Sequence, residues 1–221
     1  MLKIGTLLRF SLLGITGLVV LLLAGCGDHD HHVVFTGPGL IGIDDRPTVA
    51  ITAPQLDIEY TIPGDSGVFI VQILSDQPLD GDIEFDPFSG SYIITQGPST
   101  LLFGFNIDDS QFRAFLDFPL DGSTGEASIP LDASIISATL TVFIDFVDFA
   151  ATVPVRLDLV EYSIVNGLAP SDFDSFALEG RSFNLFDSDA GSDVFIDVTT
   201  MMREVQLLGL NDFQVRFSVG P

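Results

Sequence analysis

Alternation between apolar and polar residues is the feature that most limits the folds open to this chain. A period of two runs through residues 56–62, 155–159 and 213–219. Successive side chains of an extended strand point to opposite faces, so this period buries one face and exposes the other. Half-buried strands of this kind are typical of antiparallel sheets. The sequence therefore predicts an all-β protein built from antiparallel strands.

Turn-forming pairs separate these segments, and a single stretch has a helical pattern. The Asp-Gly pair at residues 121–122 is one of several turn signals between predicted strands. Near the C-terminus, Thr199 or Thr200 can cap a short helix over residues 201–208, which Gly209 would end. Many short strands with one short C-terminal helix predict a β-sandwich.

The strand-rich part of the chain divides by length into two regions. Residues 79–221 have the size of one sandwich domain, and residues 48–78 form a smaller strand-rich segment before it. Two arrangements stay open for the smaller segment, because it could form its own domain or extend the sandwich.

The first 25 residues have the pattern of a signal peptide. Lys3 and Arg9 precede an apolar run over residues 12–23, which is shorter than the roughly 20 residues that a membrane span needs. The following Leu-Ala-Gly-Cys sequence, which ends at Cys26, resembles the lipobox of bacterial lipoproteins. That resemblance implies cleavage after residue 25 and attachment of a diacylglycerol to the Cys26 thiol. The alternative is an uncleaved helix with a free thiol, since the chain has one cysteine and no disulfide partner.

The resemblance also implies a location. The acyl chains would anchor the exported protein in a membrane. The residue after Cys26 is Gly27 and not aspartate, which by analogy with a known sorting rule favours the outer membrane, on its periplasmic or surface face.

Residues 26–47 are interpreted as a flexible tether. Residues 28–32 hold all three histidines, and such a tract either binds a transition metal or serves as a polar spacer.

Charge and hydropathy exclude two classes of protein. The net charge is −23, and the one lysine, Lys3, lies in the signal peptide. A nucleic-acid-binding protein needs clustered cations, so nucleic acid is excluded as a partner. Hydrophobic residues make up 47% of the chain and include 20 phenylalanines, which is enough for a large core and excludes a disordered chain.

Four motifs in order along the chain resemble bacterial DNRLRE-type domains. They are the aromatic-Arg-x-Phe-Leu-x-Phe run at 112–118 with Pro119 after it, the Ile-x-Ala-x-Leu pattern at 136–140, Asp-Val-Thr at 197–199 and the closing strand at 213–217. That family is similar to carbohydrate-binding modules with a jelly-roll sandwich. The resemblance therefore implies a jelly-roll-like β-sandwich and a polysaccharide ligand.

One acidic loop is a candidate calcium site. Asp187, Asp189 and Asp193 lie at nearly alternate positions, with Gly191 to bend the backbone between them. Calcium takes several oxygen ligands from a turning loop of this kind, so the three aspartates predict structural Ca²⁺. A solvated acidic turn between two strands is the alternative interpretation.

The residue types in the predicted domain argue against catalysis. Residues 79–221 contain no histidine and no lysine, which excludes a serine–histidine–aspartate triad and a Schiff base. Only paired carboxylates of the glycosidase type remain as a less favoured alternative. The three tyrosines and the phenylalanines of the strands could stack on sugar rings, but most of them are expected in the core. Arg113 and Arg156 are expected to pair with Asp117, Asp158 or other carboxylates.

The sequence therefore predicts no enzyme. It predicts an envelope-anchored lipoprotein with a β-sandwich module for binding or adhesion, with polysaccharide as the first expected ligand. The alternative is a structural or assembly lipoprotein that docks on a protein of the envelope. An exposed aromatic platform would favour a sugar ligand, and a large exposed apolar patch would favour a protein.

Overall fold

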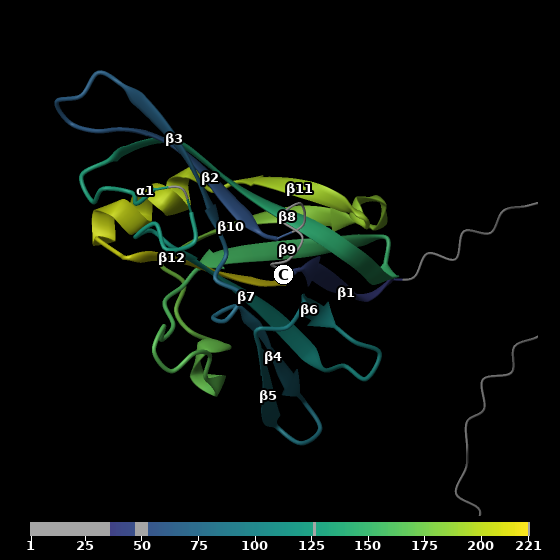
Figure 1. The fold of residues 1–221 in the computed structure, drawn as a ribbon. Helices are drawn as coiled ribbons and strands as arrows, with labels where there is room; N and C mark the ends of the chain where they lie inside the picture. Colours follow the sequence, from purple (N-terminus) through teal and green to yellow (C-terminus); the bar gives the residue numbers. More distant parts are fainter. Residues whose placement is uncertain (1–35, 47–52, 126, 221) are drawn as a thin grey trace, which may run out of the picture. The chain divides into compact units, whose positions relative to one another are not determined.

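The computed structural model describes residues 36–46, 53–125 and 127–220 of the 221-residue chain. This part is built mostly of strands (Figure 1). Its elements, in chain order, are β1 (Thr36–Asp44), β2 (Gln55–Thr61), β3 (Val68–Leu74), β4 (Gly81–Asp86), β5 (Ser91–Gln96), β6 (Thr100–Phe105), β7 (Gln111–Pro119), β8 (Ser134–Ala150), β9 (Thr152–Leu159), η1 (Pro170–Asp172), β10 (Glu179–Phe186), η2 (Asp187–Asp189), β11 (Ser192–Asp197), α1 (Thr199–Leu208) and β12 (Asp212–Val219).

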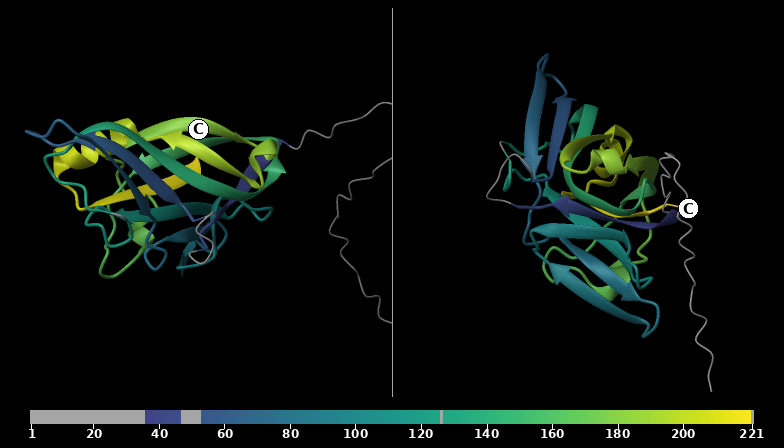
Figure 2. Two further views of the ribbon diagram at one scale, coloured as in Figure 1. Left: turned by 45° about the horizontal axis from the view of Figure 1, so that its top comes forward. Right: turned by 90° about the vertical axis from the view of Figure 1, so that its right-hand side faces the viewer.

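The described strands form one hydrogen-bonded antiparallel sheet of twelve strands. Its main path runs β10-β9-β12-β7-β6-β1-β8-β2-β3, while β11 joins β8, and the β4–β5 hairpin joins β7. The sheet curls into a half-barrel, as Figure 2 shows. The β2–β3 and β4–β5 hairpins project from it in different directions (Figure 1).

Two strands account for the curl. The 17-residue β8 pairs with β2 through residues 134–141, with β11 through 139–144 and with β1 through 144–150. Similarly, β7 pairs with β12, β4 and β6. Register shifts in the β8 pairings mark irregular points, and such bulges bend a strand and increase its twist. A strand that exchanges partners along its length joins what would otherwise be two sheets.

The predicted antiparallel β-rich fold with one short C-terminal helix is confirmed. The predicted two-sheet sandwich differs from the observed arrangement, because all described strands are linked by hydrogen bonds in one curled sheet. Because the sheet is curled, its concave face encloses the core. Each alternating strand therefore buries one of its two faces, as it would in a sandwich.

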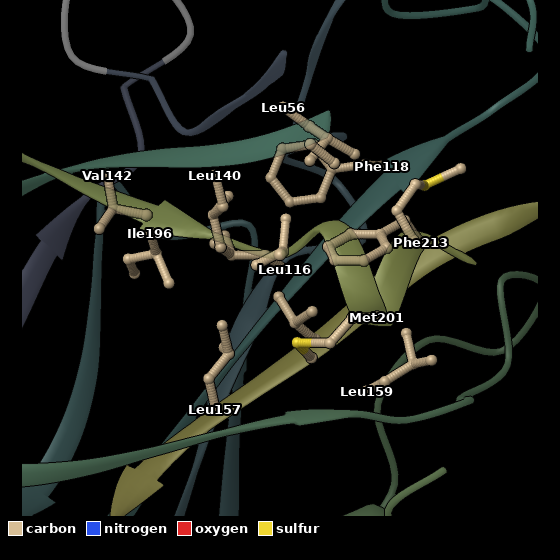
Figure 3. Packing of buried hydrophobic residues seen from close by; sticks show 14 of the residues in the cluster. Leu56, Leu116, Phe118, Leu140, Val142, Leu157, Leu159, Ile196, Met201 and Phe213 are labelled. Carbon is tan, nitrogen blue, oxygen red and sulfur yellow. The ribbon is translucent and has the colours of Figure 1, made fainter. Parts of the chain in front are cut away.

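The main core lies inside the curled sheet and is rich in phenylalanine. Phe103 and Phe217 lie with ring centroids 5.4 Å apart, and Phe118 and Phe213 lie 6.1 Å apart. All four side chains are fully buried. Figure 3 shows residues from several strands converging with Met201 of α1. The helix therefore covers part of this core with its apolar face.

The predicted C-terminal helix is confirmed, but its predicted cap is wrong. Helix α1 ends at Gly209, which has a left-handed φ of 66°. Its N-cap is Val198, whose side chain makes no capping hydrogen bond, and the first helical N–H, that of Thr199, is accepted by Asp197 Oδ1 at 3.0 Å. The Thr199 hydroxyl instead accepts the Ala138 backbone N–H at 3.0 Å and donates to Asp197 Oδ1 at 2.6 Å. Thr199 therefore fastens the start of the helix to β8.

The N-terminal elements belong to the same sheet as the rest. β1 lies inside residues 26–47, the range predicted as a tether, yet it pairs with both β6 and β8. Its glycines indicated flexibility, but a Cβ at Gly42 would lie 2.4 Å from the Phe146 ring, so this glycine permits close packing. β2 and β3, from the predicted segment 48–78, extend the sheet from β8 and share its main core.

Candidate functional site

Three buried carboxyl groups form the most unusual polar cluster of the described structure. Asp45 follows β1, Asp80 precedes β4, and Asp117 lies on β7. Their relative exposures are 1%, 0% and 0%. An isolated buried carboxylate is strongly disfavoured, so its neighbours and its protonation state must compensate.

Hydrogen bonds and a charge interaction connect the three groups. Asp80 Oδ1 accepts the Asp117 backbone N–H at 2.7 Å, and the Ser75 hydroxyl donates to Asp45 Oδ1 at 3.3 Å. Asp80 also lies close enough to Asp45 for the charge of Asp45 to raise its pKa. Within the described residues, the Oδ2 atom of each of the three aspartates lacks an N–H or O–H donor. A carboxylate in this setting is poorly compensated, which favours the protonated form.

Burial is the main cause of altered acidity in this cluster. It raises the pKa of Asp45 and of Asp80 above the ordinary value, and the charge of Asp45 raises the pKa of Asp80 further. Burial raises the pKa of Asp117 to about 7, against a hydrogen bond from Gln214 that lowers it. The pKa of the neighbouring Asp82 is raised by burial to about 6. Several of these groups therefore hold protons close to neutral pH.

A side-chain bridge extends the cluster toward β12. Gln214 Nε2 donates to Asp117 Oδ1 at 2.7 Å, and the Tyr162 backbone N–H donates to Gln214 Oε1 at 2.8 Å. Gln214 therefore connects β7 to the loop after β9. The three aspartates line none of the surface depressions described below. A carboxylate pair that hydrolyses a glycosidic bond must flank the substrate, and these carboxyls lie in the interior.

Buried cations in the described residues are paired. Arg216 donates to Asp158 Oδ2 at 2.9 Å and to the carbonyl oxygens of residues 172, 173 and 175. Arg156 donates to the other oxygen of Asp158 at 2.7 Å. Arg113 lies 2.9 Å from Asp174, and its guanidinium lies 4.0 Å from the centroid of the Phe173 ring. The expectation that Arg113 and Arg156 form ion pairs is confirmed.

Two adjoining depressions form a groove beside the C-terminal end of α1, named here the α1 groove. One has a volume of about 400 Å³ and the other about 410 Å³. Ile164, Leu210, Asn211 and Asp212 line both. The groove thus combines apolar side chains with an acidic one, on loops that precede and follow strands of the sheet.

The three aspartates of the predicted calcium site lie at the η2 turn and the start of β11. Asp187 and Asp189 belong to η2, and Asp193 lies on β11 opposite Phe143 of β8. The Asp189 carboxylate accepts the Phe186 N–H at 2.8 Å. Among the described residues, no group of three or more His, Cys, Asp or Glu side chains is arranged to hold a metal ion. The calcium site therefore remains a prediction from the sequence alone.

The tyrosines divide between core and surface. Tyr60 and Tyr162 are buried, as predicted. Tyr92 on β5 is 38% exposed, and its ring lies 5.1 Å from Phe85 and 5.4 Å from Phe173. Phe88, at the tip of the same hairpin, is exposed. Tyr92 and Phe88 are the accessible aromatic side chains that the β4–β5 hairpin offers to a ligand.

Two sequence predictions fall outside the described residues. The lipid attachment site Cys26 and the histidine tract 28–32 both precede residue 36. Within the described ranges, none of the helices has the length and apolar character to cross a membrane.

No known family profile, curated protein or solved structure matches this chain. Its function therefore has to be argued from its own residues.

Proposed function

We propose that this chain is an exported lipoprotein, anchored through Cys26 in the outer membrane, whose curled β-domain binds a ligand without catalysis. The signal-peptide pattern and the lone cysteine support the anchor. The observation that carries the non-catalytic part is the burial of Asp45, Asp80 and Asp117, whose altered acidity would otherwise point to catalysis. These groups lie in the interior, where no substrate reaches them, and the surface is left for binding.

A polysaccharide is the first ligand proposed. The resemblance of four motifs to DNRLRE-type jelly-roll modules supports it, and the exposed Tyr92 and Phe88 supply rings on which a sugar could stack. A protein of the envelope is the second ligand proposed, because Leu131 and Ile164 are exposed beside the α1 groove. Exposed apolar groups of this kind favour protein contacts.

A glycan array tests the first ligand. The full chain, purified from membranes in detergent, is applied with calcium present and again after chelation. Binding to a defined glycan class, lost on Tyr92→Ala and kept on Phe195→Ala, is the expected result, since Phe195 is an exposed aromatic on the separate strand β11. Calcium dependence would support the Asp187, Asp189 and Asp193 site as well. Silence in both conditions would remove polysaccharide as the ligand.

Membrane fractionation tests the anchor separately. The Cys26→Ser variant removes the thiol that would carry the diacylglycerol, so it should leave the membrane fraction or accumulate unprocessed. The native chain should gain the mass of the acyl chains and lose residues 1–25. An unmodified thiol at Cys26 in the membrane-bound protein would contradict the anchor.

A further inference from the structure

We infer that the α1 groove binds a segment of a protein partner that carries arginine or lysine side chains next to large apolar ones. This inference rests on the proposed function, because it takes the chain to be a binding protein and assigns the chemistry of its protein ligand. Three features support it: exposed apolar side chains on the rim, acidic side chains in the lining, and walls held by hydrogen bonds.

The rim of the groove exposes two large apolar side chains. Leu131 and Ile164 line the groove and are 63% and 49% exposed. Side chains of this size gain stability when a partner covers them. A partner that covers them must itself present apolar groups.

The lining of the groove is acidic. It contains Asp121, Asp212 and Glu161, and no arginine or lysine. Partial burial raises the pKa of Asp212, and the charges of Asp121 and Asp76 raise it further. The like charges therefore repel one another in the unbound chain. A cation of the partner placed between them would relieve that repulsion, which supplies the charge complementarity of the interaction.

Hydrogen bonds hold the walls of the groove in place. The Leu120 N–H donates to the Asn211 carbonyl oxygen at 3.0 Å, which joins the ends of β7 and β12. With its amide nitrogen turned toward the loop, Gln206 of α1 donates to the carbonyl oxygens of Leu131 and Pro130 at 2.9 and 3.0 Å. A preformed groove loses little conformational freedom on binding.

The same residues make a sugar a poor fit for this groove. Its one aromatic lining residue, Tyr162, is only 8% exposed, so it offers no ring face for stacking. The exposed aromatics Tyr92 and Phe88 lie on the β4–β5 hairpin and do not line the groove. The α1 groove is thus the surface for a protein ligand, and the β4–β5 hairpin is the surface for a polysaccharide.

A peptide titration tests the inference. The full chain in detergent is titrated against a fluorescent eight-residue peptide of alternating leucine and arginine, and binding is followed by polarisation. Matched peptides replace every arginine by glutamate or every leucine by serine. Only the leucine–arginine peptide should bind tightly. Its affinity should fall as salt is added, because exposed charges are screened.

Two charge-matched double variants separate the groove from the general acidity of the chain. Asp121→Asn with Asp212→Asn removes two groove charges and should weaken binding roughly tenfold. Asp108→Asn with Asp109→Asn removes two exposed charges from the turn between β6 and β7, outside the groove lining, and should weaken binding less than about twofold. Leu131→Ser, a change at an exposed position in the groove lining, should also weaken binding and provides a second test if the first variant unfolds.

Each other outcome overturns the inference. Equal losses in the two double variants would show attraction to the whole acidic surface and no site at the groove. Equal binding of the serine–arginine peptide would remove the role of the apolar rim. Absence of peptide binding together with a positive glycan array would reject the groove and leave the proposed binding function standing. Absence of both would reject the two together.

Discussion

At the scale of single residues, the interior accommodates ionisable groups in two ways. Arg216 is buried with Asp158 and three backbone carbonyl oxygens as partners. Within the described residues, Asp45, Asp80 and Asp117 are buried without a cation as a hydrogen-bond or ion-pair partner. Pairing therefore stabilises the charges of Arg216 and Asp158, whereas burial raises the pKa of the three unpaired aspartates and favours their protonated form. This difference leads to separate predictions for the two sets of residues.

The first prediction concerns Asp117→Asn. Asparagine keeps the acceptor for Gln214 and has no proton to lose, so it removes the cost of a buried charge above the raised pKa of about 7. At pH 8.5 the melting temperature should exceed that of the native chain by several degrees, and at pH 5 the two should agree within about 2 °C. Thermal melts followed by circular dichroism measure both. The exposed Asp187→Asn is the control and should show no such difference between the two pH values.

The second prediction concerns Arg216→Ala. The substitution leaves Asp158 and the carbonyl oxygens of the 172–175 loop without their shared buried donor. Losing one partner of a buried pair costs roughly 3–5 kcal/mol of unfolding free energy. Urea unfolding measures the loss. Arg156→Ala removes the more exposed partner of the same Asp158, and its cost should stay near 1 kcal/mol. Similar losses in the two variants would contradict the assignment of Arg216 as the principal buried partner.

At the scale of elements, the sequence predicted those strands whose two faces differ in polarity. β2, β9 and β12 alternate and were expected, and α1 was expected from its apolar spacing and Gly209. β1 falls in the range predicted as a tether, because Gly37, Gly39 and Gly42 leave no alternation of polar and apolar side chains to indicate a strand. β7 and β8 each pair with strands that are distant in the sequence, and these pairings curl the sheet. Such pairings depend on tertiary contacts, which a local sequence pattern does not reveal.

The candidate sites differ in how far the sequence revealed them. Asp117 lies in the apolar run of β7. A single acidic residue in such a run is a sequence signal of a buried carboxyl group. Asp45 and Asp80 lie in connecting segments 35 positions apart, so only the fold brings them together. The α1 groove collects loops from around 121, 164 and 211, which are equally separate in the chain.

The third prediction concerns a glycine that the sheet needs. Gly104 of β6 has a φ of 113°, and a Cβ there would lie 2.0 Å from the Gly39 carbonyl oxygen. Gly104→Ala should therefore lower the unfolding free energy by several kcal/mol, on the order of a disrupted core contact. Gly191 also has a positive φ of 76° but has open space around it, so Gly191→Ala should cost only about 1–2 kcal/mol. Chemical denaturation of both variants checks the difference, and equal costs would contradict the close approach of β6 to β1.

At the scale of the whole molecule, two forms of electrostatic energy act on stability with the same sign. The net charge of −23 makes the folded chain repel itself, and this repulsion grows as carboxyl groups ionise. The buried Asp45, Asp80, Asp82 and Asp117 add a cost of their own, because burial raises each pKa above the unfolded value. Salt separates the two, because it screens exposed charges much more than buried ones.

The fourth prediction follows from the sign of these shifts. A carboxyl whose folded pKa is raised binds more protons in the native state than in the unfolded state, so stability falls as pH rises between the two values. The contribution is complete below the unfolded value near 4. It is lost as pH rises through about 6 for Asp82 and about 7 for Asp117. Hydrogen bonds lower the pKa values of three other carboxyl groups, those of Asp86, Asp121 and Asp197. These groups change the unfolding free energy only below this pH range.

Unfolding free energies measured from pH 5 to pH 8.5, at low and at 0.5 M salt, check this prediction. Self-repulsion alone would give a decline that high salt largely removes. Buried carboxyls give a decline that persists in high salt, centred between pH 6 and 7, to which each unit of pKa shift contributes about 1.4 kcal/mol. Asp117→Asn should reduce the persistent part and leave the salt-sensitive part unchanged. A decline that vanished completely at 0.5 M salt would mean that the interior carboxyls carry no protons at neutral pH. Protonation could then no longer explain their burial.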